Sequence, residues 1–413
     1  MSVQRLEVDV ALVGGGGAGL ALLHQLALRG PHRLRVAVVD PVDRLTSRPD
    51  DRTWCFWDRF GSGGVGDDVA PALTTTWGRA VVRGPGADLD LDLAPLRYAL
   101  VRAPDFYALV ADQVSASTLQ VVHVGEPVAD VHDGADRARV VTDGTEIAAT
   151  WVFDSRPATP RRPARTVLVQ HFSGRYLRLP EPLLDPDRPV LMDLRTPQPA
   201  SGVSFGYVLP LAADRALVEY TEFSPPDPDR AGVVAADERG LDAYLALVGI
   251  AAGDVVVEHT EDGAIPMTDA GHARRVGRRV FRAGTAGGAT RASTGYTFTA
   301  VQRQARGVAA LLAAGLDPLP PRHYPRRHEV MDALLLRALA TGDLSGPGVF
   351  TRLFGRNPPA RVLALLDGAT TPGQELALMA TVPTVPMLRA LAWLAVGRRG
   401  GVPGGADPAR SPV

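Results

Sequence analysis

Glu219 is a candidate general acid on a predicted strand. Residues 203–223 predict two strands joined by a turn near residues 212–214. Because successive strand side chains point to opposite faces, Glu219 shares one face with Leu217, whereas Glu222 lies on the other. If the first face lines a pocket, desolvation raises the pKa of Glu219, which then holds a proton to donate. If it faces water, Glu219 is an ordinary surface acid.

A second carboxylate, Glu261, begins residues 261–268, which read as a turn with a proline-fixed exit. No partners at metal-ligand spacing surround the nearby His259. The single cysteine, Cys55, cannot form an intrachain disulfide or a cysteine metal cluster. We therefore expect no bound metal.

Three large aromatic side chains, Trp54, Phe56 and Trp57, follow Arg52 closely. Their negative ring faces would favour a cation if they lined a pocket. They would equally serve as a hydrophobic anchor beneath a long loop. The sequence leaves both interpretations open.

A glycine fingerprint opens the chain. Gly14, Gly16 and Gly19 have the G-x-G-x-x-G spacing, between an apolar run and the helical pattern of residues 20–28. This order predicts a strand, a tight turn that approaches a pyrophosphate, and a helix whose N-terminus faces the phosphates. The alternative is a glycine-rich loop in an ordinary parallel sheet.

The strand predicted at residues 35–39 ends at Asp40, where an acid binds a ribose diol in dinucleotide sites. The motif begins within ten residues of the N-terminus, as in many FAD proteins. We therefore expect FAD first and NAD second.

A second glycine turn contains Gly284, Gly287 and Gly288. It follows a buried strand at residues 278–283 and precedes a helix at residues 300–316. Its spacing does not fit an independent fingerprint, so we expect it to hold the same cofactor from the other side.

Length and charge limit the remaining possibilities. A chain of 413 residues predicts two domains with a helical tail. The net charge of −1 offers no bulk attraction for nucleic acid. No signal peptide and no run of about 18 apolar residues is visible, so we expect an intracellular protein. Residues 81–93 predict a hairpin, and residues 95–114 predict a helix broken near Pro104.

Taken in order, these segments resemble the flavin-containing lycopene β-cyclases of carotenoid synthesis. Six segments carry the resemblance: residues 8–19, 52–57 (RTWCFW), 153–156 (FDSR), 219–223 (EYTEF), 261–267 (EDGAIPM) and 284–298. Residues 331–336 resemble the start of the family's C-terminal helical segment. The sequence departs from the family at Tyr220, where related cyclases often carry a second acid.

The resemblance implies an α/β fold like that of aromatic hydroxylases. An FAD-binding Rossmann-like domain would comprise residues 1–160 and 270–310. A mixed, β-rich substrate domain would occupy residues 161–269, and a helical segment residues 311–413.

The resemblance also implies acid-catalysed, redox-neutral cyclisation of the linear ends of lycopene to β-ionone rings. In this family, reduced FAD is thought to stabilise the cationic intermediate, and NAD(P)H serves only to reduce it. The matching residues make Glu219 the general acid, with Glu261 orienting or deprotonating. Trp54, Phe56 and Trp57 are the candidates for the pocket wall.

Two other functions remain open. An FAD-dependent monooxygenase or prenyl-chain reductase would share the fold and the fingerprint. A non-enzymatic carotenoid-binding flavoprotein would share the pocket. The number of cyclised ends, the ring type and the oligomeric state are not readable from the sequence.

The implied substrate is a hydrocarbon confined to membranes, and the C-terminal part contains short apolar stretches. Leu388, Leu391, Trp393 and Leu394 offer apolar contacts, with Arg389, Arg398 and Arg399 nearby. We expect a cytoplasmic protein in peripheral contact with a membrane. The alternative is a C-terminal helix docked on the protein's own core.

Overall fold

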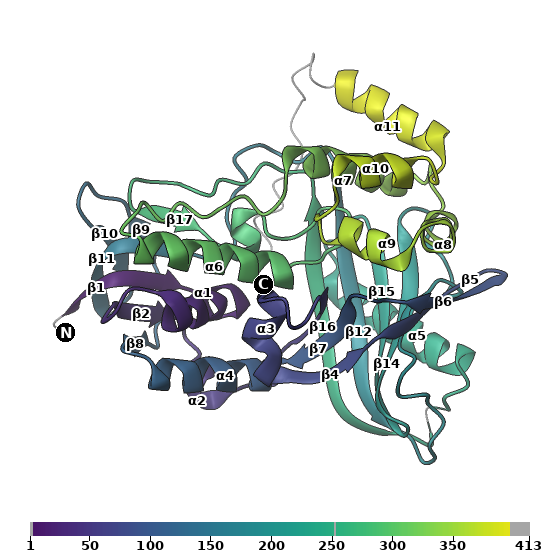
Figure 1. The fold of residues 1–413 in the computed structure, drawn as a ribbon, viewed down its shortest axis with the longest axis horizontal. Coiled ribbons are helices and arrows are strands. Elements are labelled where there is room, and N and C mark those ends of the chain that lie inside the picture. The colour runs from purple at the N-terminus through teal and green to yellow at the C-terminus, as the bar shows by residue number, and fades with distance from the viewer. Residues whose placement is uncertain (1–2, 252, 397–413) are drawn as a thin grey trace.

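The computed structural model describes residues 3–251 and 253–396, and Figure 1 shows their arrangement. Arg398, Arg399 and the rest of the predicted segment beyond residue 396 lie outside the described residues. A largely parallel seven-stranded sheet, the first sheet, lies at the left of the view, and a mostly antiparallel seven-stranded sheet, the second, lies at the right.

The first sheet has the strand order β8-β2-β1-β11-β10-β9, with β17 parallel to β11. Its strands are β1 Gln4–Val13, β2 Arg35–Val39, β8 Gln120–Val124, β9 Asp130–His132, β10 Ala138–Val141, β11 Thr145–Asp154 and β17 Val280–Arg282. The central strands are apolar and buried, as parallel strands covered on both faces require. Because β1, β2, β11 and β17 run parallel, their carboxyl ends meet at one edge.

The second sheet has the order β16-β12-β15-β14-β13-β5-β6. Its strands are β5 Arg79–Gly84, β6 Ala87–Asp92, β12 Val167–Arg178, β13 Val190–Asp193, β14 Val203–Ala212, β15 Arg215–Ser224 and β16 Val256–Thr268. A small third sheet lies between the other two and consists of β3 Thr53–Asp58, β4 Leu73–Trp77 and β7 Arg97–Arg102.

Helices cover the first sheet and one face of the second. Helix α1 packs against α4 and α6 over the first sheet, and α5 packs on β12 and β15. These helices are α1 Gly17–Arg29, α4 Ala103–Ala116, α5 Arg230–Leu247 and α6 Phe298–Ala313. Short helical turns lie at α2 Arg44–Ser47, α3 Val65–Val69, η1 Ala70–Ala72 and η2 Gly284–Gly287.

The C-terminal part forms a helical layer along the upper edge of the view in Figure 1. It contains α7 Arg326–Ala340, α8 Gly346–Arg356, α9 Pro359–Leu366, α10 Pro372–Met379 and α11 Thr384–Val396. Apolar side chains of α7, α8 and α9 join one hydrophobic core with the second and third sheets. The helical layer thus covers one face of the second sheet.

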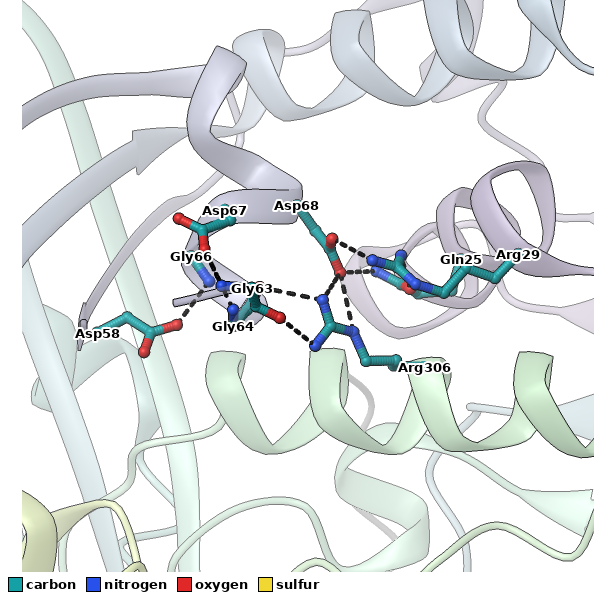
Figure 2. A network of polar contacts seen from close by, with 9 residues as sticks. All are labelled: Gln25, Arg29, Asp58, Gly63, Gly64, Gly66, Asp67, Asp68 and Arg306. Atoms are coloured by element: carbon teal, nitrogen blue, oxygen red, sulfur yellow. Dashed lines mark hydrogen bonds and ion pairs between the residues drawn. The ribbon is translucent and has the colours of Figure 1, made fainter. Parts of the chain in front are cut away.

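A polar network joins α3 and the loop before it to helices α1 and α6 (Figure 2). The Asp68 carboxylate accepts hydrogen bonds from Arg29 and Gln25 of α1 and from Arg306 of α6. Arg306 also donates to the carbonyl oxygens of Gly63 and Gly64 at 2.8 and 3.0 Å. One carboxylate therefore joins segments that lie far apart in the sequence.

The structure confirms several predicted elements and corrects two. The two strands of residues 203–223 and the hairpin of residues 81–93 are present as β14–β15 and β5–β6. The helix predicted from residue 95 is wrong in its first part, because residues 97–102 form β7 between β3 and β4. The predicted turn at residues 261–268 is wrong, since these residues continue β16. This strand tolerates Pro266 because it lies at the sheet edge.

The sheets do not divide the chain at a single boundary. Strands β5 and β6 fall inside the segment expected for the FAD domain, yet they join the second sheet. The predicted domain boundaries stay predictions.

Candidate active site

Glu219 and Glu261 lie on one face of the second sheet, on either side of Gly174. Gly174 of β12 pairs with Glu219 of β15 and with Glu261 of β16. A Cβ at Gly174 would lie 3.2 Å from Cγ of Glu261 and 3.6 Å from Cγ of Glu219. Both carboxyl side chains therefore lean over a strand position that has no side chain of its own.

The face predicted for Glu219 is the one directed at the interior. Leu217 joins the core between the second and third sheets, whereas Val218 and Tyr220 pack under α5. Glu222 accepts a hydrogen bond from Tyr220 at 2.7 Å on that opposite face. The strand alternation thus separates Glu219 from Glu222, as predicted.

The surroundings of Glu219 favour its protonated form. Burial, followed by the nearby charge of Glu261, raises the pKa of Glu219 to about 8. The Thr221 hydroxyl donates to Oε1 of Glu219 at 2.6 Å and acts in the opposite direction. Glu219 keeps part of its surface accessible, so it lies in a recess rather than in a sealed core. An acid with this pKa holds its proton at neutral pH and can donate it.

Glu261 has a different set of partners. Its Oε2 accepts a hydrogen bond from Thr53 of β3 at 2.8 Å. Burial raises the pKa of Glu261, while the Thr53 hydrogen bond and the charges of Arg52 and Arg102 oppose that effect. The sheet therefore places two carboxyls in unlike environments, which is how paired acids acquire different roles.

Aromatic rings of the third sheet and of the second glycine turn lie close to the carboxyl pair. Trp57 of β3 meets Tyr296 edge to face, with ring centroids 4.6 Å apart, and stacks with Tyr98 at 6.1 Å. Tyr207 of β14 pairs directly with Glu219. Burial and the neighbouring Tyr296 and Glu219 raise the pKa of Tyr207 well above its usual range. These neutral, electron-rich rings suit a positive charge better than polar side chains would.

Of the three predicted wall residues, Trp57 lies on the carboxyl side of β3, whereas Trp54 and Phe56 do not; the pocket wall itself stays a prediction. Trp54 and Phe56 point to the opposite face of β3, where both pack against Phe298 at 5.6 and 5.1 Å. Trp54 also lies against the first turn of α1, because a Cβ at Gly17 would be 3.1 Å from its ring. The alternation of β3 therefore places these two rings on the side of α1 and Phe298.

The first glycine turn has the shape of a phosphate cradle. Gly14 has φ +98°, which favours glycine, and a Cβ at Gly19 would strike the carbonyl oxygen of Gly14. At Gly16, by contrast, an added Cβ would meet no protein atom within 4 Å. The backbone of Gly16 thus borders open space at the N-terminus of α1, where N–H groups attract phosphate.

The second glycine turn lies beside the first. Gly284 has φ +61°, and its Cβ position is 2.6 Å from Cβ of Ala18 in α1. Gly288 has φ +85° and packs on His272, and Gly287 lies between these two glycines in η2. Both turns follow strands whose carboxyl ends share one sheet edge, the usual place for a ligand in such sheets.

Asp40 lies at the same edge but is already engaged. Its carboxylate accepts hydrogen bonds from the backbone N–H groups of Gly15 and Val42 at 2.8 and 2.9 Å. Arg44 lies 3.1 Å from Oδ1. A carboxylate has about four acceptor positions, so one remains for a ribose hydroxyl. The open face at Gly16, the paired turns and this acid together fit a dinucleotide such as FAD.

Fold and site define a class: the chain has the fold of FAD-dependent flavoproteins of the aromatic-hydroxylase type. It resembles a geranylgeranyl bacteriochlorophyll reductase-like protein from Thermoplasma acidophilum with a TM-score of 0.64 at 13% identity, covering 94% of this chain and 99% of that one. A flavoprotein/dehydrogenase from Cytophaga hutchinsonii gives a TM-score of 0.62 at 13% identity, covering 95% of this chain and 100% of that one. A p-nitrophenol 4-monooxygenase from Pseudomonas putida gives a TM-score of 0.55 at 16% identity, covering 95% of this chain and 98% of that one. The predicted fold class is confirmed.

Within that class, the chain belongs to the lycopene cyclase protein family, whose model matches residues 9–392. A lycopene beta-cyclase from Pseudescherichia vulneris is 26% identical over 330 residues, which are 78% of each chain. The chloroplastic lycopene beta cyclase of Arabidopsis thaliana is 26% identical over 314 residues, 70% of this chain and 57% of that protein. The chain thus spans little more than half of the plant relative's length.

Four residues of the site escaped the sequence analysis: Thr53, Gly174, Tyr176 and Tyr207. Gly174 had the clearest signal, because a glycine inside a strand often marks a close approach of neighbouring groups. The other three carry no local signal, since their partners lie on other strands.

Proposed function

We propose that this chain is a lycopene β-cyclase that adds a proton to a terminal double bond of lycopene and closes a β-ionone ring. The observation that supports it best is the pair of unlike carboxyls across Gly174, of which Glu219 has a pKa near 8. Alkenes are weak bases, so their protonation needs a positioned acid in a dry site.

The reaction balances without any change of oxidation state. Glu219 gives its proton to the terminal double bond, and a neighbouring double bond attacks the resulting cation to form the ring carbon–carbon bond. A ring proton then leaves, and Glu261 is the carboxylate best placed to accept it. Trp57, Tyr207 and Tyr296 would face the cation with their π systems.

The cofactor in this proposal is FAD, held by the first glycine turn, Asp40 and the second glycine turn. Reduced FAD would supply an electron-rich ring beside the cation, and NAD(P)H would serve only as its reductant. Arg44 and Ser155 support the turn: Arg44 pairs with Asp40, and Ser155 donates to the carbonyl oxygen of Val13 at 2.9 Å.

Pigment formation in cells that make lycopene tests this proposal. The wild-type protein should convert lycopene to cyclic carotenes. Glu219→Gln should keep its fold and flavin but lose at least about 100-fold in conversion, because an amide has no transferable proton. Glu222→Gln, on the opposite strand face, is the matched control and should retain conversion.

Unchanged lycopene with the wild-type protein would reject the cyclase function. Normal conversion by Glu219→Gln would remove Glu219 from the mechanism while leaving the function intact. A hydroxylated or hydrogenated product would favour a monooxygenase or a prenyl-chain reductase.

We further propose that helices α10 and α11 contact a membrane surface. Among residues 3–251 and 253–396, no single helix is long and apolar enough to span a bilayer; α10 together with residues 384–395 reaches that length only as a pair bent by 119°. Exposed apolar side chains gather on these two helices: Leu376, Met379, Val385, Leu388 and Leu391. An apolar surface of this kind suits the lipid interface from which a polyene must be drawn.

Trp393 is not part of that surface, contrary to the expectation from sequence. Its ring lies between the guanidinium groups of Arg165 and Arg337, at 4.0 and 4.1 Å. Arg165 also donates to the carbonyl oxygens of Trp393 and Leu394. Trp393 therefore fastens the end of α11 to the protein and leaves Leu388 and Leu391 outside.

Liposome flotation tests this docking surface. Changing Leu376, Leu388 and Leu391 together to Ser should abolish flotation while leaving the fold intact. The control is the double variant Leu183→Ser with Leu247→Ser, which alters exposed leucines outside α10 and α11. It should float with liposomes as the wild type does. Equal flotation of the triple variant and the wild type would place the docking surface elsewhere.

A further inference from the structure

Two hydroxyl groups, those of Tyr176 and Thr53, form a hydrogen-bonded chain that ends on Glu261. The chain does not reach Glu219. Thr53 Oγ1 lies 2.8 Å from Oε2 of Glu261 and 2.7 Å from the hydroxyl of Tyr176. Tyr176 is 2% exposed and stands on β12, the strand that also carries Gly174. The third sheet and the second sheet therefore meet at this chain.

The chain can run in only one direction without leaving a buried group unsatisfied. Within the described part of the protein, the Tyr176 hydroxyl contacts no hydrogen-bond partner other than Thr53. A hydrogen on Oε2 of Glu261 would be donated to Thr53, Thr53 would then donate to Tyr176, and the Tyr176 hydrogen would have no acceptor. A buried hydroxyl in that state is unfavourable. Tyr176 therefore donates to Thr53, and Thr53 donates to Glu261.

Arginine side chains face Glu261, whereas none of the described ones acts on Glu219. Groups facing Glu261 are Asp50, Arg52, Arg102, Tyr176, Cys55 and Glu219. Arg102 forms an ion pair with Asp50 and lies over the Tyr176 ring at 4.9 Å. The charge of Asp50 raises the pKa of Glu261, and the charges of Arg52 and Arg102 lower it. His259 also lies beside the Tyr176 ring, with centroids 5.7 Å apart.

Glu219 has no comparable support. It faces Glu261, Thr221, Tyr207, Tyr296 and Cys55, and within residues 3–251 and 253–396 only the Thr221 hydroxyl donates a hydrogen bond to it. Glu261 also accepts from a threonine hydroxyl, but that hydroxyl itself accepts from Tyr176, whereas no second hydroxyl stands behind Thr221 among the described residues. Two donors in series polarise each other, so the chain on Glu261 binds a carboxylate better than one isolated hydroxyl does.

We propose that Thr53 and Tyr176 are positioning residues that decide which carboxyl of the pair carries the proton: their ordered hydroxyl chain holds Glu261 as the carboxylate and leaves the proton on Glu219. This assignment rests on the proposed cyclase function for its catalytic meaning. It makes Glu219 the acid and Glu261 the base before the substrate arrives.

The pH dependence of cyclisation tests the assignment, because the two carboxyls limit opposite sides of the profile. At low pH the rate falls when Glu261 gains a proton and stops acting as a base. At high pH it falls when Glu219 loses its proton. Thr53→Val removes the hydrogen-bond donor to Glu261 and should raise the pKa of Glu261. The low-pH side of the rate profile should therefore move up by about one pH unit. Because Glu261 then competes for the proton that the pair shares, the fraction of protein with this proton on Glu219, and with it the maximum rate, should fall.

The experiment compares wild type, Thr53→Val, Thr53→Ser and Tyr176→Phe. Thr53→Ser keeps the hydroxyl and should restore the wild-type profile. Tyr176→Phe should move the low-pH side of the profile up and lower the maximum rate as Thr53→Val does, but less, and it serves as the second variant if Thr53→Val fails to fold. Identical profiles for Thr53→Val and Thr53→Ser, or an unchanged profile for Tyr176→Phe, would overturn the assignment.

Infrared titration of the carboxyl groups gives a readout that needs no turnover. In the wild-type protein, a protonated-carboxyl band that is absent from Glu219→Gln should titrate near pH 8. It should be weaker in Thr53→Val. A wild type that shows this band but forms no cyclic product would reject the cyclase function and keep the proton assignment. A wild type that cyclises while its band belongs to Glu261 would reject the assignment alone.

Discussion

At the scale of residues, the arrangement depends on a strand position that lacks a side chain. Gly174 lets the carboxyls of Glu219 and Glu261 approach each other across the strand between them. Mutual proximity is what makes their protonation unequal, because two like charges in a dry site cannot both ionise freely.

Gly174→Ala should separate function from stability. Its Cβ would press on Cγ of Glu261 at 3.2 Å and displace the carboxyls by a few tenths of an ångström. We expect roughly 10-fold or more loss of cyclisation, with a stability change below about 1 kcal/mol. Turnover and thermal unfolding measure the two effects. Ser173→Ala, on the opposite face of β12, is the control, and equal activity of the two variants would contradict the role of Gly174.

The sequence predicted the orientation of Glu219 but not its partners. Period-two alternation within one strand is a local property, so Leu217 and Glu219 could be assigned to one face. The contact of Glu261 with Thr53 joins residues that are 208 positions apart. Packing of the third sheet against the second produces this contact, and no local sequence pattern encodes that packing.

At the scale of elements, the glycine turn before α1 should control cofactor binding alone. Gly16→Val should fold, because an added Cβ at this position meets no protein atom within 4 Å. The same side chain would fill the space that a pyrophosphate needs. We expect at least a 100-fold loss of FAD affinity. Flavin absorbance of the purified protein measures it, with Gly373→Val, also in open space, as control. Normal flavin content in a folded Gly16→Val protein would disprove the predicted cradle.

The Asp68 network should make an acid-sensitive contribution to stability. Burial alone would raise the pKa of Asp68, but hydrogen bonds from Arg29 and Gln25 and the charges of Arg29 and Arg306 hold it below its usual value. A lowered folded-state pKa stabilises the protein above the unfolded pKa of about 3.9, and this contribution disappears as the pH falls through the folded pKa.

Asp68→Asn should therefore lower the free energy of unfolding by about 2 kcal/mol at neutral pH. The difference from wild type should shrink in acid. Urea unfolding at pH 7 and below pH 4 measures both values, and Asp112→Asn on the exposed face of α4 is the control. A difference that stays constant with pH would show that the charge of Asp68 is not involved.

Elements were predictable where their pattern was long, and not where the run was short. Residues 97–102 are buried at four successive positions, which fits a helix segment or a buried strand equally well. Pairing with β3 and β4 decides for the strand. The turn expected at residue 261 failed for a similar reason, since the sheet edge accepts a proline that a central strand would reject.

At the scale of the whole molecule, segments far apart in sequence assemble two neighbouring sites. The two glycine turns meet on α1, although Ala18 and Gly284 are separated by most of the chain. The third sheet presents Trp54 and Phe56 to the cofactor side and Thr53 and Trp57 to the carboxyl side. A resemblance across the whole chain predicted this architecture, whereas the division of β3 between two sites required the structure.

Product analysis under anaerobic conditions tests the central claim most directly. Protein reduced once with dithionite is given an excess of lycopene without NAD(P)H, and the products are separated and weighed by mass spectrometry. We predict many turnovers to a cyclic product with the same elemental composition as lycopene. A product that gains two hydrogens or one oxygen, or one reducing equivalent consumed per product formed, would contradict a redox-neutral cyclase.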